Sequence, residues 1–399
     1  MLFKLNNTYT KKYIDVILIF FLMVIIFTLI LKFSRLDLHA HIAQAQKMNS
    51  DQASYPSNFL YYLLLNFFSF FNTNFYTRIG VAILLLSLAT TAKYVISKTI
   101  IFEYLSINKI SYPINKIALF SLGLLLMFSI PDFYSLFTLD YWYLSRFPPT
   151  VWHNSTTIFV FPFAILLFWK QFLFMHSYSK TNFKTIIVLI GLVILNIIIK
   201  PSFLFVFIPV TGIYILITQW KKGLRKMFIF ALPSIVGILL LLFSYLLIYQ
   251  LQTGSFQKES SSISLSPLFY LYQKWMPLWY IPISLLISLL FPIILFFIFL
   301  KNKININLST YTFSMTFLAI LISAFVIETG PRETHGNFIW QNIIAVYILQ
   351  LVSTILYIQY RINPQKSMIK KNILLFIFSL HIISGVLYIS RIILFNDVF

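Results

Sequence analysis

The sequence predicts an all-α bundle of membrane-spanning helices, because it is strongly apolar, poor in charge and divided into apolar runs of similar length. Hydrophobic residues make up 59% of its 399 residues, charged residues make up 10%, and the mean hydropathy is +0.86. A soluble domain has about 25% charged residues. A helix of about 20 apolar residues crosses the hydrocarbon core of a bilayer with its backbone groups bonded to one another. We therefore expect one transmembrane domain over residues 1–399 and no separate soluble domain.

About eleven of the apolar runs have the composition of a span. They cover residues 13–33, 79–97, 117–131, 156–175, 183–199, 203–220, 227–250, 279–300, 310–327, 338–358 and 373–392. The first run has no small-residue cleavage site at its end, which favours a retained span over a signal peptide. No internal repeat is evident, and this disfavours the transporter folds that are built from inverted repeats.

A shorter apolar run covers residues 56–71, and the distribution of charge predicts where it lies. If this run stays outside, most of the Lys and Arg residues fall on the cytoplasmic side, as is usual for membrane proteins. The cytoplasmic segments are then 1–12, 93–116, 170–184, 221–226, 301–303 and 361–371. A full span at 56–71 would move most of these basic residues outside. We therefore expect interfacial helices in the first outer loop, a cytoplasmic N-terminus and a C-terminus outside the cell membrane.

This orientation places the polar side chains in four outer loops. The loops are 34–78, 132–156, 251–278 and 328–338. The net charge of +20 then reflects basic residues between spans, and we expect no nucleic-acid binding because no soluble module carries a basic face. The chain has no cysteine, which excludes disulfides, thiolate catalysis and cysteine-based zinc sites.

In the first outer loop, Asp37, His39 and His41 crowd together where the first span ends. A carboxylate beside two imidazoles could serve as a general base or as part of a metal site. The alternative is an acid that a nearby Lys or Arg neutralises at the level of the lipid headgroups.

Two further segments carry polar side chains next to span ends. His153 and Asn154 come just before the span at 156–175, where they either line a site or act as ordinary helix-capping residues. Lys200 stands alone between two spans on the outer side, against the general trend of the basic residues. It therefore either binds an anionic group or extends its charged end to the membrane surface.

The densest polar cluster is the loop at 328–338, which combines charged residues with glycine and proline. Its polar members are Glu328, Arg332, Glu333, His335 and Asn337. The planar guanidinium of Arg332 suits a phosphate group, and His335 can share that charge. The alternative is that Arg332 pairs with a neighbouring glutamate, so that the two groups satisfy each other.

The N-terminal quarter of the sequence resembles the C-type glycosyltransferase superfamily, in particular protein O-mannosyltransferases and lipid A aminoarabinose transferases. In that branch an Asp after the first span opens a loop with an Ala-rich helix, a proline-containing stretch, an aromatic amphipathic helix and an Arg before the second span. The matching residues, in this order, are Asp37, Ala40, Ala43, Ala45, Pro56, Tyr61, Tyr62 and Arg78. Many relatives carry a second acid directly after the first, where this chain has Leu38, so nothing supports a divalent metal here.

The resemblance implies an inverting glycosyltransferase that works at the outer leaflet without a cofactor. It implies a polyprenyl-phosphate-linked sugar as donor and a glycan, lipid or protein as acceptor. Asp37 would be the general base. The candidates for holding the donor phosphate are Arg332, His335, Lys200 and Arg78. The candidates for binding the rest of the substrates are His39, His41, His153, Asn154, Glu328 and Asn337.

Three other functions stay open on the sequence. One is a polysaccharide polymerase or ligase that uses lipid-linked oligosaccharide and similar outer loops. Another is a transporter of lipids or solutes, which would need ionisable residues near the bilayer midplane, where this sequence has almost none. The third is a structural subunit of an envelope assembly complex.

Overall fold

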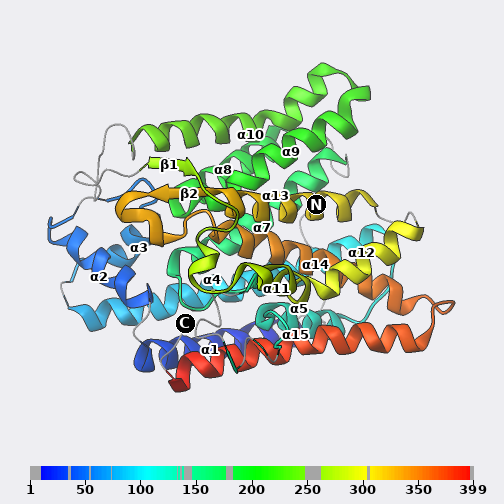
Figure 1. The fold of residues 1–399 in the computed structure, drawn as a ribbon, viewed down its shortest axis with the longest axis horizontal. Helices are drawn as coiled ribbons and strands as arrows, with labels where there is room; N and C mark the ends of the chain where they lie inside the picture. The colour runs from blue at the N-terminus through cyan, green and yellow to red at the C-terminus, as the bar shows by residue number, and fades with distance from the viewer. Residues whose placement is uncertain are drawn as a thin grey trace.

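The computed structural model is an all-α bundle of long helices that run roughly parallel and antiparallel to one another (Figure 1). The structure describes residues 10–34, 37–53, 55–72, 74–132, 134, 137–138, 146–176, 183–247, 262–302 and 306–395. The helices that can each cross a membrane are α1 (Thr10–Phe33), α4 (Phe75–Ile107), α7 (Ser155–Met175), α9 (Leu204–Gln219, with the short turn η1 at Pro201–Phe203 before it), α10 (Leu224–Tyr245), α13 (Ile306–Phe325), α14 (Trp340–Ile362) and α15 (Met368–Phe395). The shorter helices are α2 (Asp37–Asn49), α3 (Leu60–Phe68), α5 (Ile114–Leu126), α8 (Phe183–Ile199), α11 (Ile281–Ser288) and α12 (Leu290–Asn302). The prediction of an all-α polytopic bundle is confirmed.

Eight helices of the described part are long and apolar enough to cross a membrane, and a bent pair makes a ninth candidate. The pair consists of α11 and α12, with a bend of 63° between them. The other two predicted spans fall on α5 and α8, which have 13 and 17 residues. At 1.5 Å per residue these helices are about 20 and 26 Å long, which is less than the hydrocarbon core of roughly 30 Å. Helix length therefore supports eight or nine spans rather than the eleven expected.

Helix α14 runs through the middle of the bundle (Figure 1) and packs against α4, α7, α12 and α13. Its side chains are almost all buried, so its polar groups find partners on neighbouring helices rather than in water. Gln350 donates to the carbonyl oxygen of Ser288 at 3.4 Å. The carbonyl oxygen of Ala345 accepts from Thr316 at 3.2 Å. These bonds tie α14 to the helices around it.

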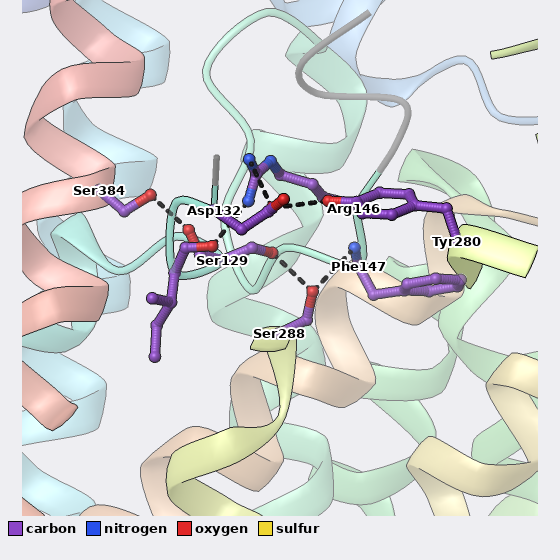
Figure 2. Close-up of polar contacts among 8 residues, drawn as sticks. Ser129, Asp132, Arg146, Phe147, Tyr280, Ser288 and Ser384 are labelled. Atoms are coloured by element: carbon purple, nitrogen blue, oxygen red, sulfur yellow. Dashed lines mark hydrogen bonds and ion pairs between the residues drawn. The ribbon is translucent and has the colours of Figure 1, made fainter. Parts of the chain in front are cut away.

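After α5 the chain continues as irregular backbone inside the bundle, where lipid cannot satisfy its carbonyl groups. Side chains from distant segments provide the missing donors, and Figure 2 shows part of this arrangement. The carbonyl oxygens of residues 127, 128, 129 and 130 accept, in this order, from Thr150, His381, Ser384 and Arg146. Helix α5 can therefore end at Leu126 although the apolar sequence continues beyond it.

Arg146 is buried and binds this irregular segment, whose Asp132 also bonds to a residue before α11 (Figure 2). Its Nη1 donates to the carbonyl oxygen of Ile130 at 2.7 Å, and its Nη2 lies 3.5 Å from the carboxylate of Asp132. The same carboxylate accepts from the Tyr280 hydroxyl at 2.6 Å. Burial lowers the pKa of Arg146 to about 10, against the opposing effect of Tyr280 and Asp132, so the guanidinium stays charged at neutral pH.

We expect Arg146→Met to lower the free energy of unfolding by about 1–3 kcal/mol, because the Ile130 carbonyl loses its buried donor. Thermal unfolding in detergent measures this loss as a fall in Tm. The matched control is Lys274→Met, which breaks an exposed 2.6 Å ion pair with Glu333 and should cost less than about 1 kcal/mol. Equal losses in the two variants would show that Arg146 does not hold the irregular segment.

The two ends of the bundle carry different segments. In Figure 1, α2, α3 and a small sheet lie on the left, whereas the α9–α10 and α14–α15 turns lie on the right. The sheet pairs β1 (Ser262–Leu265) antiparallel with β2 (Val326–Thr329). The turns on the right contain the basic residues of two predicted cytoplasmic segments, 221–226 and 361–371. The small sheet and helices α2 and α3 therefore lie at the opposite end of the bundle from these two predicted cytoplasmic turns.

Two charge-based expectations have different outcomes. The apolar run at 56–71 contains only the nine-residue helix α3, which is far too short to cross a membrane and packs against α2 and α4. Lys93, which we expected in a cytoplasmic segment, is instead buried within α4. Its Nζ lies 3.7 Å from the ring centre of Phe161 and 3.8 Å from that of Tyr347. Counting charges was wrong for Lys93 because its amine is accommodated inside the bundle between two aromatic rings.

Candidate functional site

Asn154 is the centre of a polar cluster formed where α2 and α7 begin. Its Oδ1 accepts from the backbone N–H of Thr157 at 3.1 Å and from the Thr157 hydroxyl at 2.7 Å, so it caps α7 as the sequence predicts. Its Nδ2 donates to the Asp37 carboxylate at 3.4 Å. Asp37 is the first residue of α2 and is exposed. Asn154 therefore caps α7 and also binds Asp37 at the start of α2.

Lys200 enters the cluster from the turn between α8 and α9. Pro201 starts the turn η1 and favours an extended backbone at the residue before it, and Lys200 has this conformation with φ −166° and ψ 109°, so α8 ends at Ile199. Its Nζ donates to Asn154 Oδ1 and to Thr156 Oγ1, each at 3.2 Å. The same ammonium lies 4.7 Å from the ring centre of Trp340, the first residue of α14. A carboxylate and a buried ammonium are thus joined through one amide side chain.

Two histidines flank this pair, and each bonds to a tyrosine. His41 Nδ1 lies 2.7 Å from the Tyr62 hydroxyl of α3, and His153 Nδ1 lies 2.9 Å from the Tyr388 hydroxyl of α15. Burial and, to a smaller extent, the charge of Lys200 lower the pKa of His41 to about 4, against the opposing effect of Asp37. Burial likewise lowers the pKa of His153 to about 4. Both imidazoles are therefore neutral at physiological pH.

The charge that titrates near neutral pH belongs to Lys200. Burial lowers its pKa to about 7, although Asp37 and Glu328 both raise it. The ammonium form is thus present below about pH 7 and is lost above it. The lowered pKa also makes the stability of the protein depend on pH. Between pH 7 and 10.5 the unfolded chain, in which Lys200 has its usual pKa of 10.5, binds one more proton than the folded protein. The free energy of unfolding should therefore rise between pH 7 and 10.5.

We expect Lys200 to attract an anionic group, such as a lipid phosphate, less strongly as the pH rises through about 7, because Lys200 then loses its positive charge. The histidines cannot produce this transition, since they are already neutral. Lys200→Arg should remove the transition, because a guanidinium stays charged over the whole range. The transition is measured as lipid binding between pH 5.5 and 9, for the purified wild-type protein and for Lys200→Arg. An unchanged transition in Lys200→Arg would assign it to another group.

The predicted 328–338 loop adjoins this cluster, with Glu328 near enough to Lys200 to raise its pKa. Glu328 is a buried residue of strand β2 and lies 3.2 Å from the guanidinium of Arg332. Asn337 also donates to the Glu328 carboxylate. Arg332 therefore pairs with Glu328, as the alternative interpretation of this loop expected. The side chain of His335 lies outside the described part of the structure.

Two predicted site residues, Arg78 and His39, contact residues that hold helices together. Arg78 is buried and donates through Nε to Asn66 Oδ1 at 3.0 Å, while Asn66 Nδ2 donates to the carbonyl oxygen of Ala45 at 2.9 Å. These bonds hold α4 against α3 and α2. His39 stacks on Phe75 of α4, with 6.3 Å between the ring centres. The structure thus links Arg78 and His39 to helix packing.

Three contacts of the cluster were missing from the sequence prediction. Thr156 lay within a capping pattern, and Trp340 followed the outer loop at 328–338, so their positions near a span end were a usable signal. Tyr388 had no such signal, because it lies in an apolar run that gives no sign of its partner His153. Helix packing alone brings these two residues together.

The chemistry of the cluster comes from one carboxylate, one ammonium, neutral imidazoles, and amide and hydroxyl groups. Within the described ranges, no three His, Asp or Glu residues are grouped so that they could hold a metal ion. Asp37 can take a proton from a hydroxyl group, and Lys200 can stabilise a negative charge that forms nearby. Comparisons with protein-family models, with curated proteins and with solved structures find no match to this chain.

Proposed function

We propose that this protein is an inverting membrane glycosyltransferase. It would take a sugar from a polyprenyl-phosphate carrier and transfer it to an acceptor hydroxyl of the cell envelope. The observation that carries the proposal is the arrangement of Asp37 and Lys200 on opposite sides of Asn154, at distances of 3.4 and 3.2 Å from its amide. A base and a cation held this close suit a reaction in which a proton leaves one oxygen and negative charge collects on another.

In the proposed reaction the acceptor oxygen forms a bond to the anomeric carbon of the sugar. The bond from that carbon to the phosphate oxygen breaks, and the electron pair leaves with the phosphate. Asp37 takes the proton of the acceptor hydroxyl, while Lys200 balances the charge of the leaving phosphate. His41 and His153 contribute hydrogen bonds rather than charge, because their lowered pKa values keep them neutral. The attack comes from the face opposite the leaving group, so the configuration inverts.

The proposed site belongs on the non-cytoplasmic side of the membrane. Asp37 begins α2, and Lys200 is linked to it through Asn154. Helix α2 lies at one end of the bundle in Figure 1, whereas the basic turns at 221–226 and 361–371 lie at the other end. Basic residues favour the cytoplasmic side of a membrane. Polyprenyl-phosphate sugars of the outer leaflet would then reach the site directly.

The test is a transfer assay with the purified protein in proteoliposomes. Polyprenyl-phosphate donors with different radiolabelled single sugars are supplied with envelope extract as acceptor, and the product is analysed for its anomeric configuration. Inverted transfer from a single-sugar donor supports the proposal. Product formed only from undecaprenyl-linked repeat units would assign a polymerase or ligase instead, and retention of configuration would exclude the mechanism.

A transporter is the second candidate, because Lys93 is an ionisable residue buried inside the bundle. Its Nζ lies between the rings of Phe161 and Tyr347, and the described residues include no acid paired with it. Charged residues within membrane spans often mark a substrate path. Uptake or lipid movement by the same proteoliposomes, lost in Lys93→Met and present without any sugar transfer, would favour this candidate.

A further inference from the structure

We infer that the outward face of α3, with the turn that follows it, is inserted into the hydrocarbon of the membrane beside the Asp37 cluster, where it contacts lipid chains. The insertion itself is independent of the proposed function. The consequence for a lipid-linked donor rests on that function. Three observations carry the inference: the polarity of α3, the conformation of its last turn, and its position next to the cluster.

The polarity of α3 is the reverse of that of a helix in water. Its sequence is LYYLLLNFF, and its buried residues are Tyr61, Tyr62, Leu65 and Asn66. The amide of Asn66 faces inward, where it binds Arg78. The outward side chains are apolar, with Phe67 57% and Phe68 51% exposed. A surface helix in water shows polar residues on its exposed face, so this exposed face fits lipid.

The turn after α3 holds two aromatic residues in a backbone conformation that favours glycine. Phe70 has φ 53° and Phe71 has φ 54°, both in the left-handed region. The N–H of Phe71 donates to the carbonyl oxygen of Asn66 at 2.8 Å and that of Phe70 to Phe67 at 2.9 Å, which is the bonding pattern of a helix that ends in a left-handed residue. Asn49 of α2 fixes the turn through a 2.8 Å bond to the Phe71 carbonyl.

The side chain of Phe70 is 90% exposed in this strained turn. In water, both the backbone of Phe70 and its exposed ring would be unfavourable, and glycine would relieve both costs. In hydrocarbon the exposed ring is favourable and can offset the backbone strain. The combination of strain and exposure therefore points to lipid around this residue.

The opposite face of α3 reaches the candidate site. The Tyr62 hydroxyl lies 2.7 Å from His41, whose pKa is affected by both Asp37 and Lys200. One short helix therefore separates the polar cluster from the outward apolar face. A donor with its phosphate near Lys200 and its chain in the bilayer would lie along α3.

The insertion can be measured directly, because the chain contains no cysteine. Single-cysteine variants Phe70→Cys, Leu88→Cys and Asp51→Cys carry a nitroxide label in proteoliposomes. Leu88 is exposed on the spanning helix α4, and Asp51 is exposed in the loop after α2, so they report hydrocarbon and water. We expect the Phe70 label to be relaxed by oxygen, as at Leu88, and not by a water-soluble nickel chelate. Relaxation like that at Asp51 would overturn the inference, whether or not the protein transfers sugar.

The donor consequence is tested with Phe70→Gly. We expect an unchanged or higher Tm, because glycine suits the left-handed turn, together with a KM for long-chain polyprenyl donors that rises roughly 10-fold while kcat is kept. A donor with a short, water-soluble chain should show no change in KM. The matched control is Asp51→Gly, which relieves a left-handed residue at φ 56° without removing an apolar ring and should leave both KM values unchanged. An unchanged long-chain KM in Phe70→Gly would exclude donor contact at this turn.

Discussion

Replacement of Gly385 by alanine should lower the free energy of unfolding by about 4 kcal/mol or more and prevent accumulation of the folded protein. Gly385 lies on α15 where this helix crosses the end of α5. A methyl group there would overlap the carbonyl oxygen of Leu126 and lie 2.6 Å from its carbonyl carbon. Backbone atoms cannot give way as a flexible side chain does, so α15 must move away from α5.

The movement would also break hydrogen bonds that the irregular segment after α5 needs. His381 and Ser384, one turn or less before Gly385, donate to the carbonyl oxygens of Phe128 and Ser129. Unpaired carbonyl groups inside a membrane bundle are costly. The packing clash and the loss of these bonds therefore act in the same direction.

Size-exclusion profiles and thermal unfolding in detergent measure the Gly385→Ala effect. The matched control is Gly191→Ala, in the middle of α8, where a methyl group meets no atom within 4 Å. Alanine is the better helix former, so this control should be neutral or slightly stabilising. Similar Tm values for the two variants would contradict the close contact between Gly385 and the backbone of Leu126.

The sequence predicted those features of the fold that depend on the residues of one helix alone. Apolar runs predicted the class of the fold, and the shortness of 56–71 agreed with a helix that does not cross the membrane. The end of α5 at Leu126 was not predictable, because the sequence stays apolar to residue 130. Its irregular continuation depends on donors such as His381, more than 250 positions later in the chain. A local pattern cannot contain that information.

The site was predictable in its members more than in its geometry. Proximity to the outer span ends singled out Asp37, Asn154 and Lys200 as candidates, and the structure places them in contact. The same rule also singled out Arg78, whose partner is Asn66 in α3. Position along the chain tells at which end of the bundle a side chain lies, whereas helix packing determines which neighbours it meets.

Under the proposed function, Asp37→Asn should reduce sugar transfer by about 10²–10⁴-fold while the bundle stays intact. The amide keeps the size of the carboxylate but cannot take the proton of the acceptor hydroxyl. Because Asp37 is exposed and the asparagine can still accept the 3.4 Å bond from Asn154, its replacement should lower the free energy of unfolding by no more than about 1 kcal/mol. Initial rates at saturating donor in proteoliposomes measure the effect. Asp51→Asn, an exposed acid in the same outer loop, is the control and should keep full activity.

A second measurement separates a base from a merely structural acid. Asp37 raises the pKa of Lys200, so its neutralisation should move the pH at which lipid-phosphate binding weakens to below about 7. The shift follows from the charge of Asp37 and does not depend on turnover. Full transfer activity in Asp37→Asn with a shifted binding profile would leave Asp37 as a neighbour of Lys200 but would rule it out as the base. Transfer should therefore be measured at a pH where Lys200 of the variant is still protonated. Loss of transfer at that pH, together with the shifted binding profile, would assign two roles to Asp37: proton acceptor and charged neighbour of Lys200.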